Sequence, residues 1–268
     1  MRASAVRVVR HSTRCRRARR RRVLWAGGEL LVTVGVVLML LVVHQLWWTN
    51  REARRGAERK VEALEREWGA GSGDGSSSGF PDSSGASVGS AASSPSPGAA
   101  SPTRQRSYVT VGSSRPRSSQ AYAVMTIPRL HLRVPVAEGV SKQNVLNKGY
   151  VGHYPGTQQP GQAGNFAVAG HRNTHGEPFR YLPRLRPKDV VEVETRSATY
   201  TYTVDKILPR TSSRDSGVVR PVPRSVVKPG YGYGRPGYYI TLTTCTPEFT
   251  SRYRMVVWGR LTSMRPRS

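Results

Sequence analysis

Cysteine is nearly absent from this chain: only two occur among 268 residues, at positions 15 and 245. So few cysteines exclude a fold held together by disulfides and a cysteine-rich zinc module. Acidic residues are also scarce, with 16 Asp and Glu against 42 Lys and Arg, which gives a formal net charge of +26. Hydrophobic residues make up only 37% of the chain, less than one globular domain normally contains. We therefore expect part of the chain to lie outside any packed core.

The composition changes several times along the chain. The first 22 residues contain ten Arg and no acid, and an apolar block follows them. Next come a block with six basic and five acidic residues and a stretch rich in Gly, Ser, Ala and Pro. These changes predict an Arg-rich tail (1–22), a membrane anchor (23–48), a charged helical stalk (49–68), a disordered linker (69–118) and a folded domain (119–268).

The apolar block 23–48 is long enough to cross a membrane. Its 26 residues extend roughly 39 Å as a helix, against about 30 Å for the hydrocarbon core of a bilayer. Its most apolar part, Leu30–Val43, also has the length of a secretory signal, but no small-residue cleavage pattern follows it. Trp25, Trp47 and Trp48 flank the block as interfacial aromatics do. We therefore expect an uncleaved single-pass anchor, with the Arg-rich N-terminus in the cytoplasm and residues 49–268 outside.

The strongly basic composition suggests nucleic acid as a partner, but the expected topology argues against it. Ten of the positive charges lie in the N-terminal tail, where they orient the anchor. Residues 119–268 carry 22 basic and 8 acidic side chains, a net charge of +14, and are expected outside the cell. The anionic partners there are cell-wall polymers and lipid headgroups, so this charge predicts weak attraction to the wall or membrane.

The charged block 49–68 is predicted to continue as a helix. Arg54 with Glu58, and Glu62 with Arg66, are four residues apart, a spacing at which side chains can pair on a helix surface. This pattern favours a solvated stalk. The following linker, as a flexible coil, spans about 40 Å and would let the outer domain move near the membrane.

The outer domain has the pattern of an all-β fold. Pro and Gly cluster between short apolar segments, and residues 199–205 alternate with period two. Helical periodicity is confined to one possible turn around Phe179–Leu185. Such a pattern indicates a closed barrel or a sandwich. The predicted strands are Tyr122–Ile127, Leu132–Val136, Asn165–Ala169, Val190–Thr195, Thr199–Ile207, Tyr238–Thr244 and Arg254–Leu261.

Cys245 is the candidate nucleophile of this domain. The predicted anchor separates it from Cys15, so it has no disulfide partner within the chain. A free thiol has a pKa of about 8.5 and needs a base or a cation to react at neutral pH. His171 follows a predicted strand, and Arg254 opens the strand after Cys245, so a hairpin would make Cys245 and Arg254 neighbours. A thiol, an imidazole and a guanidinium at one barrel rim are typical of acyl transfer.

Two residues compete for these roles. His175 lies four residues after His171, a spacing that would suit zinc on a helix, but Gly170, Gly176 and Pro178 argue against a helix there. We therefore expect no zinc site at this pair. Arg252 lies two residues before Arg254 and would share its strand face if both were extended.

At these residues the sequence resembles the sortases. The carrying motifs are TLTTC, with Arg254 nine residues after Cys245, and the upstream GNFAVAGHRNTHGEPF. GHYPGT, AGHR and the final CTPEF and RYRMVVWG are similar to the class E sortases of actinobacteria. The resemblance covers residues 119–268. It implies a β-barrel of about eight strands with short helices, with Cys245 as nucleophile, His171 as general acid or base and Arg254 as the stabiliser of the oxyanion or substrate.

The resemblance also implies a reaction that uses no metal and no organic cofactor. A cysteine transpeptidase of this family cuts a C-terminal sorting signal between Thr and Gly and joins the secreted protein to an amine of a peptidoglycan precursor through a thioacyl intermediate. Class E similarity favours Leu-Ala-x-Thr-Gly over Leu-Pro-x-Thr-Gly as the signal. Two alternatives remain: a pilin-polymerising sortase with a lysine acceptor and a non-enzymatic wall-binding module. From the reference pKa values of a thiol and an imidazole, the sequence predicts a bell-shaped pH profile in which activity needs a deprotonated Cys245 and a protonated His171. It leaves open whether the pair rests as thiolate and imidazolium or as two neutral groups.

Overall fold

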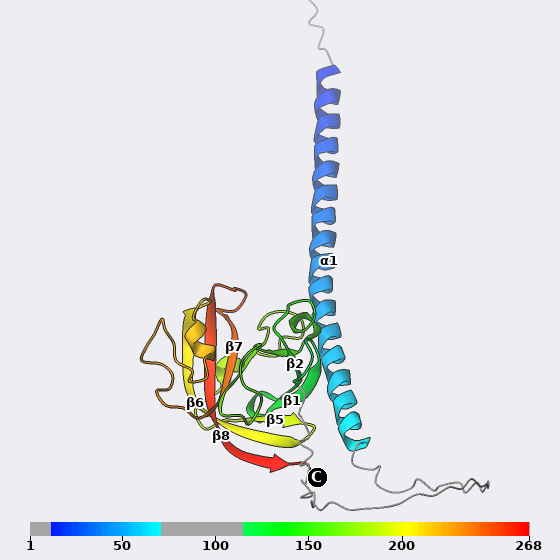
Figure 1. Ribbon diagram of the computed structural model, residues 1–268. Coiled ribbons are helices and arrows are strands. Elements are labelled where there is room, and N and C mark those ends of the chain that lie inside the picture. Colours follow the sequence, from blue (N-terminus) through cyan, green and yellow to red (C-terminus); the bar gives the residue numbers. More distant parts are fainter. Residues whose placement is uncertain (1–11, 71–114, 268) are drawn as a thin grey trace, which may run out of the picture.

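The computed structural model describes residues 12–70 and 115–267. It consists of one long helix, α1 (Ser12–Ala70), beside a closed barrel of eight strands (Figure 1). The strands follow one another around the barrel in the order β1-β2-β3-β4-β7-β8-β6-β5. Their bounds are β1 Ala121–Ile127, β2 Leu132–Glu138, β3 Val151–His153, β4 Gly164–Ala169, β5 Val190–Thr195, β6 Ala198–Ser212, β7 Tyr238–Thr246 and β8 Tyr253–Pro266.

The predicted closed barrel of about eight strands is confirmed, with one strand missed and two extended. The missed strand is β3, which is only three residues long and too short to show a period. β6 and β8 have 15 and 14 residues, several more than their apolar patterns indicate. They are longer because they pair with each other along most of their lengths, with three shifts in register. The hydrogen bonds between them include residues that have no apolar pattern of their own.

Short 3-10 turns connect the strands. They are η1 Pro128–Leu130, η2 Leu146–Lys148, η3 Leu182–Arg184 and η4 Ser216–Val219. The turn expected around 179–185 is η3. Most of the predicted linker and half of the predicted N-terminal tail lie outside the described residues.

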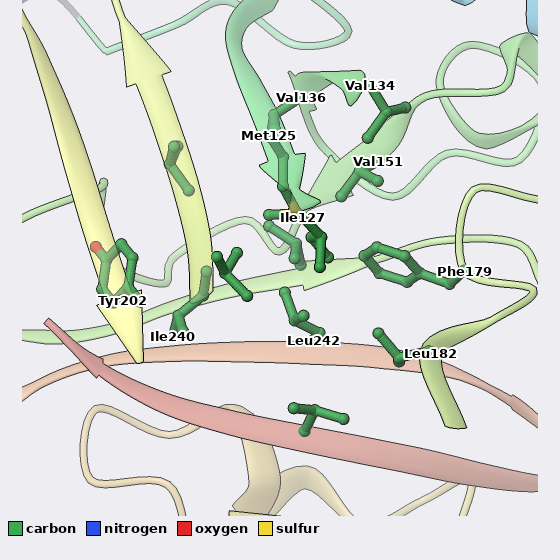
Figure 2. Packing of buried hydrophobic residues seen from close by; sticks show 14 of the residues in the cluster. Met125, Ile127, Val134, Val136, Val151, Phe179, Leu182, Tyr202, Ile240 and Leu242 are labelled. Atoms are coloured by element: carbon green, nitrogen blue, oxygen red, sulfur yellow. The ribbon is translucent and has the colours of Figure 1, made fainter. Parts of the chain in front are cut away.

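The barrel interior is filled by aliphatic and aromatic side chains from all eight strands. Met125, Val136, Ile240 and Leu242 point into it from β1, β2 and β7 (Figure 2). Phe179 and the neighbouring Leu182 enter the same core from the segment that follows β4 and are fully buried. The loop after β4 is therefore fixed at its far end by hydrophobic packing.

The sequence pattern favoured a solvated stalk, but in the structure this segment of α1 packs against the barrel. Its apolar side chains at 53, 57, 61, 64 and 68 are buried, and this spacing places them on one helix face. Val61, Leu64 and Trp68 pack against β1, β2 and the loop before η2. Arg54, expected to pair with Glu58, instead binds Glu177 of the barrel at 2.9 Å. Charged residues between the apolar ones conceal this stripe in the sequence.

The docked helix fixes the orientation of the barrel. Asn50, at the upper end of the docked segment, bonds the loop after β4. Trp68, at the lower end, lies under the guanidinium of Arg267, which is 4.9 Å from the ring centre. β8 therefore runs away from the apolar half of α1, and β7 runs toward it (Figure 1). The carboxyl end of β7, with Cys245, lies at the barrel end nearest the apolar half of the helix.

The apolar half of α1 is long and hydrophobic enough to cross a membrane, with a mean hydropathy of 2.4 in its most apolar window. None of that window is buried by the barrel. This agrees with the expected anchor in length and composition, and Trp47 and Trp48 are exposed just before the docked segment.

Leu64 provides a test of helix docking. It is 3% exposed and packs on the barrel, so Leu64→Ala removes a buried side chain whose loss typically costs about 2–5 kcal/mol. We expect faster amide hydrogen exchange and faster proteolysis within residues 57–68, while the barrel strands remain protected.

Glu67→Ala is the matched control, because Glu67 lies on the exposed face of the same turn. Its exchange rates should equal those of the unsubstituted chain. Equal protection of residues 57–68 in the Leu64→Ala variant would show that the helix does not depend on this contact.

Candidate active site

Cys245 lies near the end of β7 and is partly exposed. β7 pairs on one side with β8, in a register that places Cys245 opposite Arg254. On its other side β7 runs parallel to β4, and their last pair is Ala169 with Thr243. The end of β4, the end of β7 and the start of β8 therefore meet at one end of the barrel, with β7 between β4 and β8.

His171 is the second residue after β4, just as Cys245 is the second residue after the last β4–β7 pair. The amide of Gly170 donates to the carbonyl of Thr243 at 3.1 Å, so the parallel register continues one step past the strand. Glycine is required at 170 because an added Cβ would lie 2.7 Å from the buried ring of Phe179. The close packing of Gly170 therefore places His171 beside the end of β7.

One hydrogen bond fixes the proton position on His171. Nε2 lies 2.9 Å from Oδ1 of Asn147, in η2. An amide oxygen can only accept, so Nε2 carries the hydrogen and Nδ1 keeps its lone pair. In its neutral form His171 can therefore accept a proton at Nδ1.

Burial, assisted by the nearby charges of His175 and Lys142, lowers the pKa of His171 to about 4. The ring of the free protein is therefore neutral at pH 7. The sequence argument left the resting protonation state of this ring open, because reference pKa values contain no burial.

His175 does not replace His171. The two rings stack with centres 5.4 Å apart, and burial lowers the pKa of His175 as well. His175 lies farther along the loop, at a positive φ of 52°, beyond the register that places residue 171 next to β7. Within residues 12–70 and 115–267 no group of three or more metal-binding side chains gathers here or elsewhere.

The two arginines near the turn between β7 and β8 occupy different positions. Arg254 lies in β8, and its Nη1 donates to the carbonyls of Ser251 and Tyr253 at 2.9 and 3.0 Å. Arg252 lies before the strand begins, is exposed, and rests on the ring of Tyr253. The two do not share a strand face, and only Arg254 pairs with Cys245 in the register.

Arg172 is a residue near the thiol that sequence reasoning missed. Its Nη1 lies 3.3 Å from the carbonyl oxygen of Cys245 and 3.1 Å from the hydroxyl of Thr246. Its Nε is buried and bonds none of the described residues. Its place directly after His171 was the available signal. Asn147 was also missed, because nothing in its local sequence marks it.

The two threonines before Cys245 use their hydroxyls within the barrel. Both Thr243 and Thr244 are buried. Thr243 donates to the carbonyl of Val168 at 3.1 Å, and Thr244 to that of Gly170 at 2.8 Å. Their hydroxyls tie β7 to the end of β4, so they stabilise the frame that carries Cys245 and His171.

The lowered pKa of His171 predicts a pH-dependent stability. The unfolded chain binds a proton at about pH 6.5, whereas the folded chain does so only near pH 4. Protonation therefore favours the unfolded state, and stability falls as pH decreases from about 6.5 toward 4. We expect His171→Gln to lose less stability than the unsubstituted chain between pH 7.5 and 4.5, measured by denaturant midpoints.

Cys245→Ala is the control for that experiment, since it keeps His171 and should keep the full pH dependence. An identical pH dependence in His171→Gln and the unsubstituted chain would contradict the burial of a neutral ring at 171.

Comparison with known proteins agrees with this geometry. The family described as "Sortase domain" matches residues 125–262. The chain is 41% identical over 248 residues to Sortase SrtE1 of Streptomyces coelicolor, covering 91% of this chain and 58% of that protein. It is 30% identical to Sortase SrtE2 of the same organism, covering 87% and 80%.

Solved structures show the same relationship. A crystal structure of Sortase E1 from Streptomyces coelicolor with a tripeptide in the active site aligns at a TM-score of 0.52 and 50% identity, covering 55% of this chain and 91% of that one. Sortase E from Streptomyces avermitilis aligns at 0.50 and 41%, covering 56% and 93%. The chain spans just over half the length of SrtE1. It belongs to the sortase family and is similar to its class E members.

Proposed function

We propose that this chain is a membrane-anchored transpeptidase in which Cys245, His171 and Arg254 carry the chemistry. The observation that supports this most strongly is the strand register, which pairs Cys245 with Arg254 and brings the end of β4, with His171, alongside. The substrate is a secreted protein with a C-terminal signal similar to Leu-Ala-x-Thr-Gly or Leu-Pro-x-Thr-Gly. The tripeptide in the active site of the related Sortase E1 structure is consistent with a peptide substrate.

The first half of the reaction transfers the Thr acyl group to sulfur. The thiol proton of Cys245 passes to Nδ1 of His171 as the sulfur attacks the Thr carbonyl carbon, forming the C–S bond. The hydrogen bonds of Arg254 to the described residues all use Nη1, so Nη2 and Nε are available to the developing oxyanion. The C–N bond to Gly then breaks, and the proton on His171 goes to the leaving amine.

The second half releases the product. An acceptor amine attacks the thioacyl carbon, gives a proton to Nδ1 of His171, and forms a new amide as the C–S bond breaks. The proton then returns from His171 to the sulfur of Cys245. Because the ring begins and ends neutral, one nitrogen serves as base and acid in turn, as the lowered pKa of His171 allows.

The acceptor is proposed to be an amine of a peptidoglycan precursor. The barrel end that carries Cys245 is turned toward the apolar half of α1 (Figure 1). If that half spans the membrane with the barrel outside, the site opens near the bilayer surface, where lipid-linked wall precursors are held. The net positive charge of residues 119–268 would support contact with anionic polymers there.

Mass spectrometry of the reaction products tests this function. The full chain in detergent, given a labelled sorting peptide and a glycine-type amine, should produce a Thr–amine adduct. Cys245→Ala should lose it entirely, because residues 115–267 contain no other cysteine that could form the thioacyl bond. A lysine side-chain adduct in preference to the glycine-type adduct would indicate the pilin-polymerising alternative.

Binding of wall polymer is the other arm of that test. A non-enzymatic wall-binding module would bind the polymer equally well with and without the Cys245→Ala substitution and would form no adduct in either case. Adduct formation by the unsubstituted chain that disappears in Cys245→Ala excludes this alternative.

The two arginines near the turn between β7 and β8 allow a matched comparison. We expect Arg254→Ala to lower kcat/KM by about 100-fold or more, the loss typical for removal of an oxyanion donor. Arg252→Ala should lower it less than about threefold, because Arg252 is exposed and outside the β7–β8 register. Equal losses in the two variants would remove Arg254 from the proposed role.

A further inference from the structure

The helix contacts the very loop that carries His171. Asn50 donates from Nδ2 to Oε1 of Glu177 at 3.0 Å and accepts at Oδ1 from the amide of Gly176 at 3.3 Å. Arg54 donates from Nε to the carbonyl of Gly176 at 3.0 Å and from Nη2 to Oε2 of Glu177 at 2.9 Å. Two helix residues one turn apart thus make four hydrogen bonds to Gly176 and Glu177. Residues 175–177 form one corner of the loop.

This corner has an unusual backbone. His175, Gly176 and Glu177 are consecutive and all have positive φ, at 52°, 83° and 53°. A left-handed conformation costs a residue with a side chain roughly 1–2 kcal/mol. The side chain of Glu177 is only 4% exposed and also binds Arg180 at 2.7 Å. A backbone of this kind persists when surrounding contacts fix it, and α1 supplies several of those contacts.

The corner is connected to His171 in two ways. The ring of His175 stacks on that of His171. The amide of Phe179 donates to the carbonyl of His171 at 3.0 Å, which closes the loop, and Phe179 is locked in the barrel core (Figure 2). With one end fixed by packing, the other side of the loop is held by the helix.

The hydrogen-bond partner of His171 lies across a groove from the same helix. Asn147 borders a groove of about 400 Å³ whose opposite wall is α1, from Trp48 to Gly56. Two residues later, Gly149 packs so closely that an added Cβ would lie 2.8 Å from the carbonyl oxygen of Ala53 and 3.4 Å from that of His175. Gly149 therefore touches both the helix and the loop corner.

We propose that Asn50 and Arg54 of α1 are positioning residues for His171. By clamping Gly176 and Glu177 they fix the loop that carries the imidazole, so the segment directly after the apolar half of α1 is part of the catalytic apparatus rather than a spacer. This inference rests on the proposed function, since it assigns these residues a role in the His171-dependent reaction.

Kinetics of the full chain in detergent test this role. Arg54→Ala and Asn50→Ala should each lower kcat by about 10-fold or more, since small misplacements of a reacting group have effects of this size. KM for the sorting peptide should change little. Arg54→Lys, which can make one of the two contacts, should recover part of the loss.

Arg66→Ala is the matched control. Arg66 lies on the same helix, is exposed, and its described bond is to the helix carbonyl of Glu62. Its kcat should equal that of the unsubstituted chain. In Arg54→Ala the acid limb of the kcat profile should also move to higher pH, because a looser loop exposes His171. The groups that face that ring are His175, Lys142 and Asn147.

A pair of glycines provides an independent test. Gly149→Ala places a methyl against the helix, whereas Gly156→Ala meets no atom within 4 Å. The two positions have almost the same φ, 79° and 83°, so both variants carry the same backbone strain. Only Gly149→Ala should lower kcat and increase hydrogen exchange in α1.

The outcomes separate the two proposals. Absence of a Thr–amine adduct with the unsubstituted chain would end the proposed function. An active unsubstituted chain whose kcat and pH profile are unchanged by Arg54→Ala, Asn50→Ala and Gly149→Ala would leave the function standing and overturn the positioning role.

Discussion

The arrangement of the site depends on β7 having two different neighbours. On one side it runs parallel to β4, and on the other antiparallel to β8. A parallel neighbour ends where β7 ends, and an antiparallel neighbour begins there. One strand therefore gathers a residue that follows β4, its own Cys245 and a residue that opens β8 at a single barrel rim. No proposed catalytic residue has to reach across the core, and each is held by backbone hydrogen bonds.

Hydrophobic packing and polar function are combined in the loop after β4. Gly170 leaves room for the ring of Phe179, which belongs to the barrel core. Because Gly170 packs against this ring, the neighbouring His171 is partly buried. The same burial lowers the pKa of His171, so that the ring is neutral and can accept a proton. Asn147 then decides which nitrogen holds the existing hydrogen. Core packing thus sets the protonation state of His171, and the side-chain amide of Asn147 sets its tautomer.

The docked helix changes how the anchor is understood. A stalk and linker would leave the barrel free to rotate beneath the membrane, with its active end facing any direction. The buried stripe of α1 and the clamp on Gly176 and Glu177 instead give the barrel one orientation relative to the apolar half of the helix. Trp47 and Trp48, which precede Asn50 by less than a turn, then lie close to the level of the His171 loop.

The sequence by itself determined the strands with clear patterns and the barrel class, and it predicted Cys245, His171 and Arg254 as the site, because strand periodicity, Gly and Pro punctuation and short motifs are local signals. It could not determine β3, the full lengths of β6 and β8, the bond from Asn147, the approach of Arg172 or the docking of α1. Each of these depends on a partner far away in the chain. The pKa of His171 belongs to the same group: reference values describe a solvated ring, and only the closed barrel supplies the burial that lowers it.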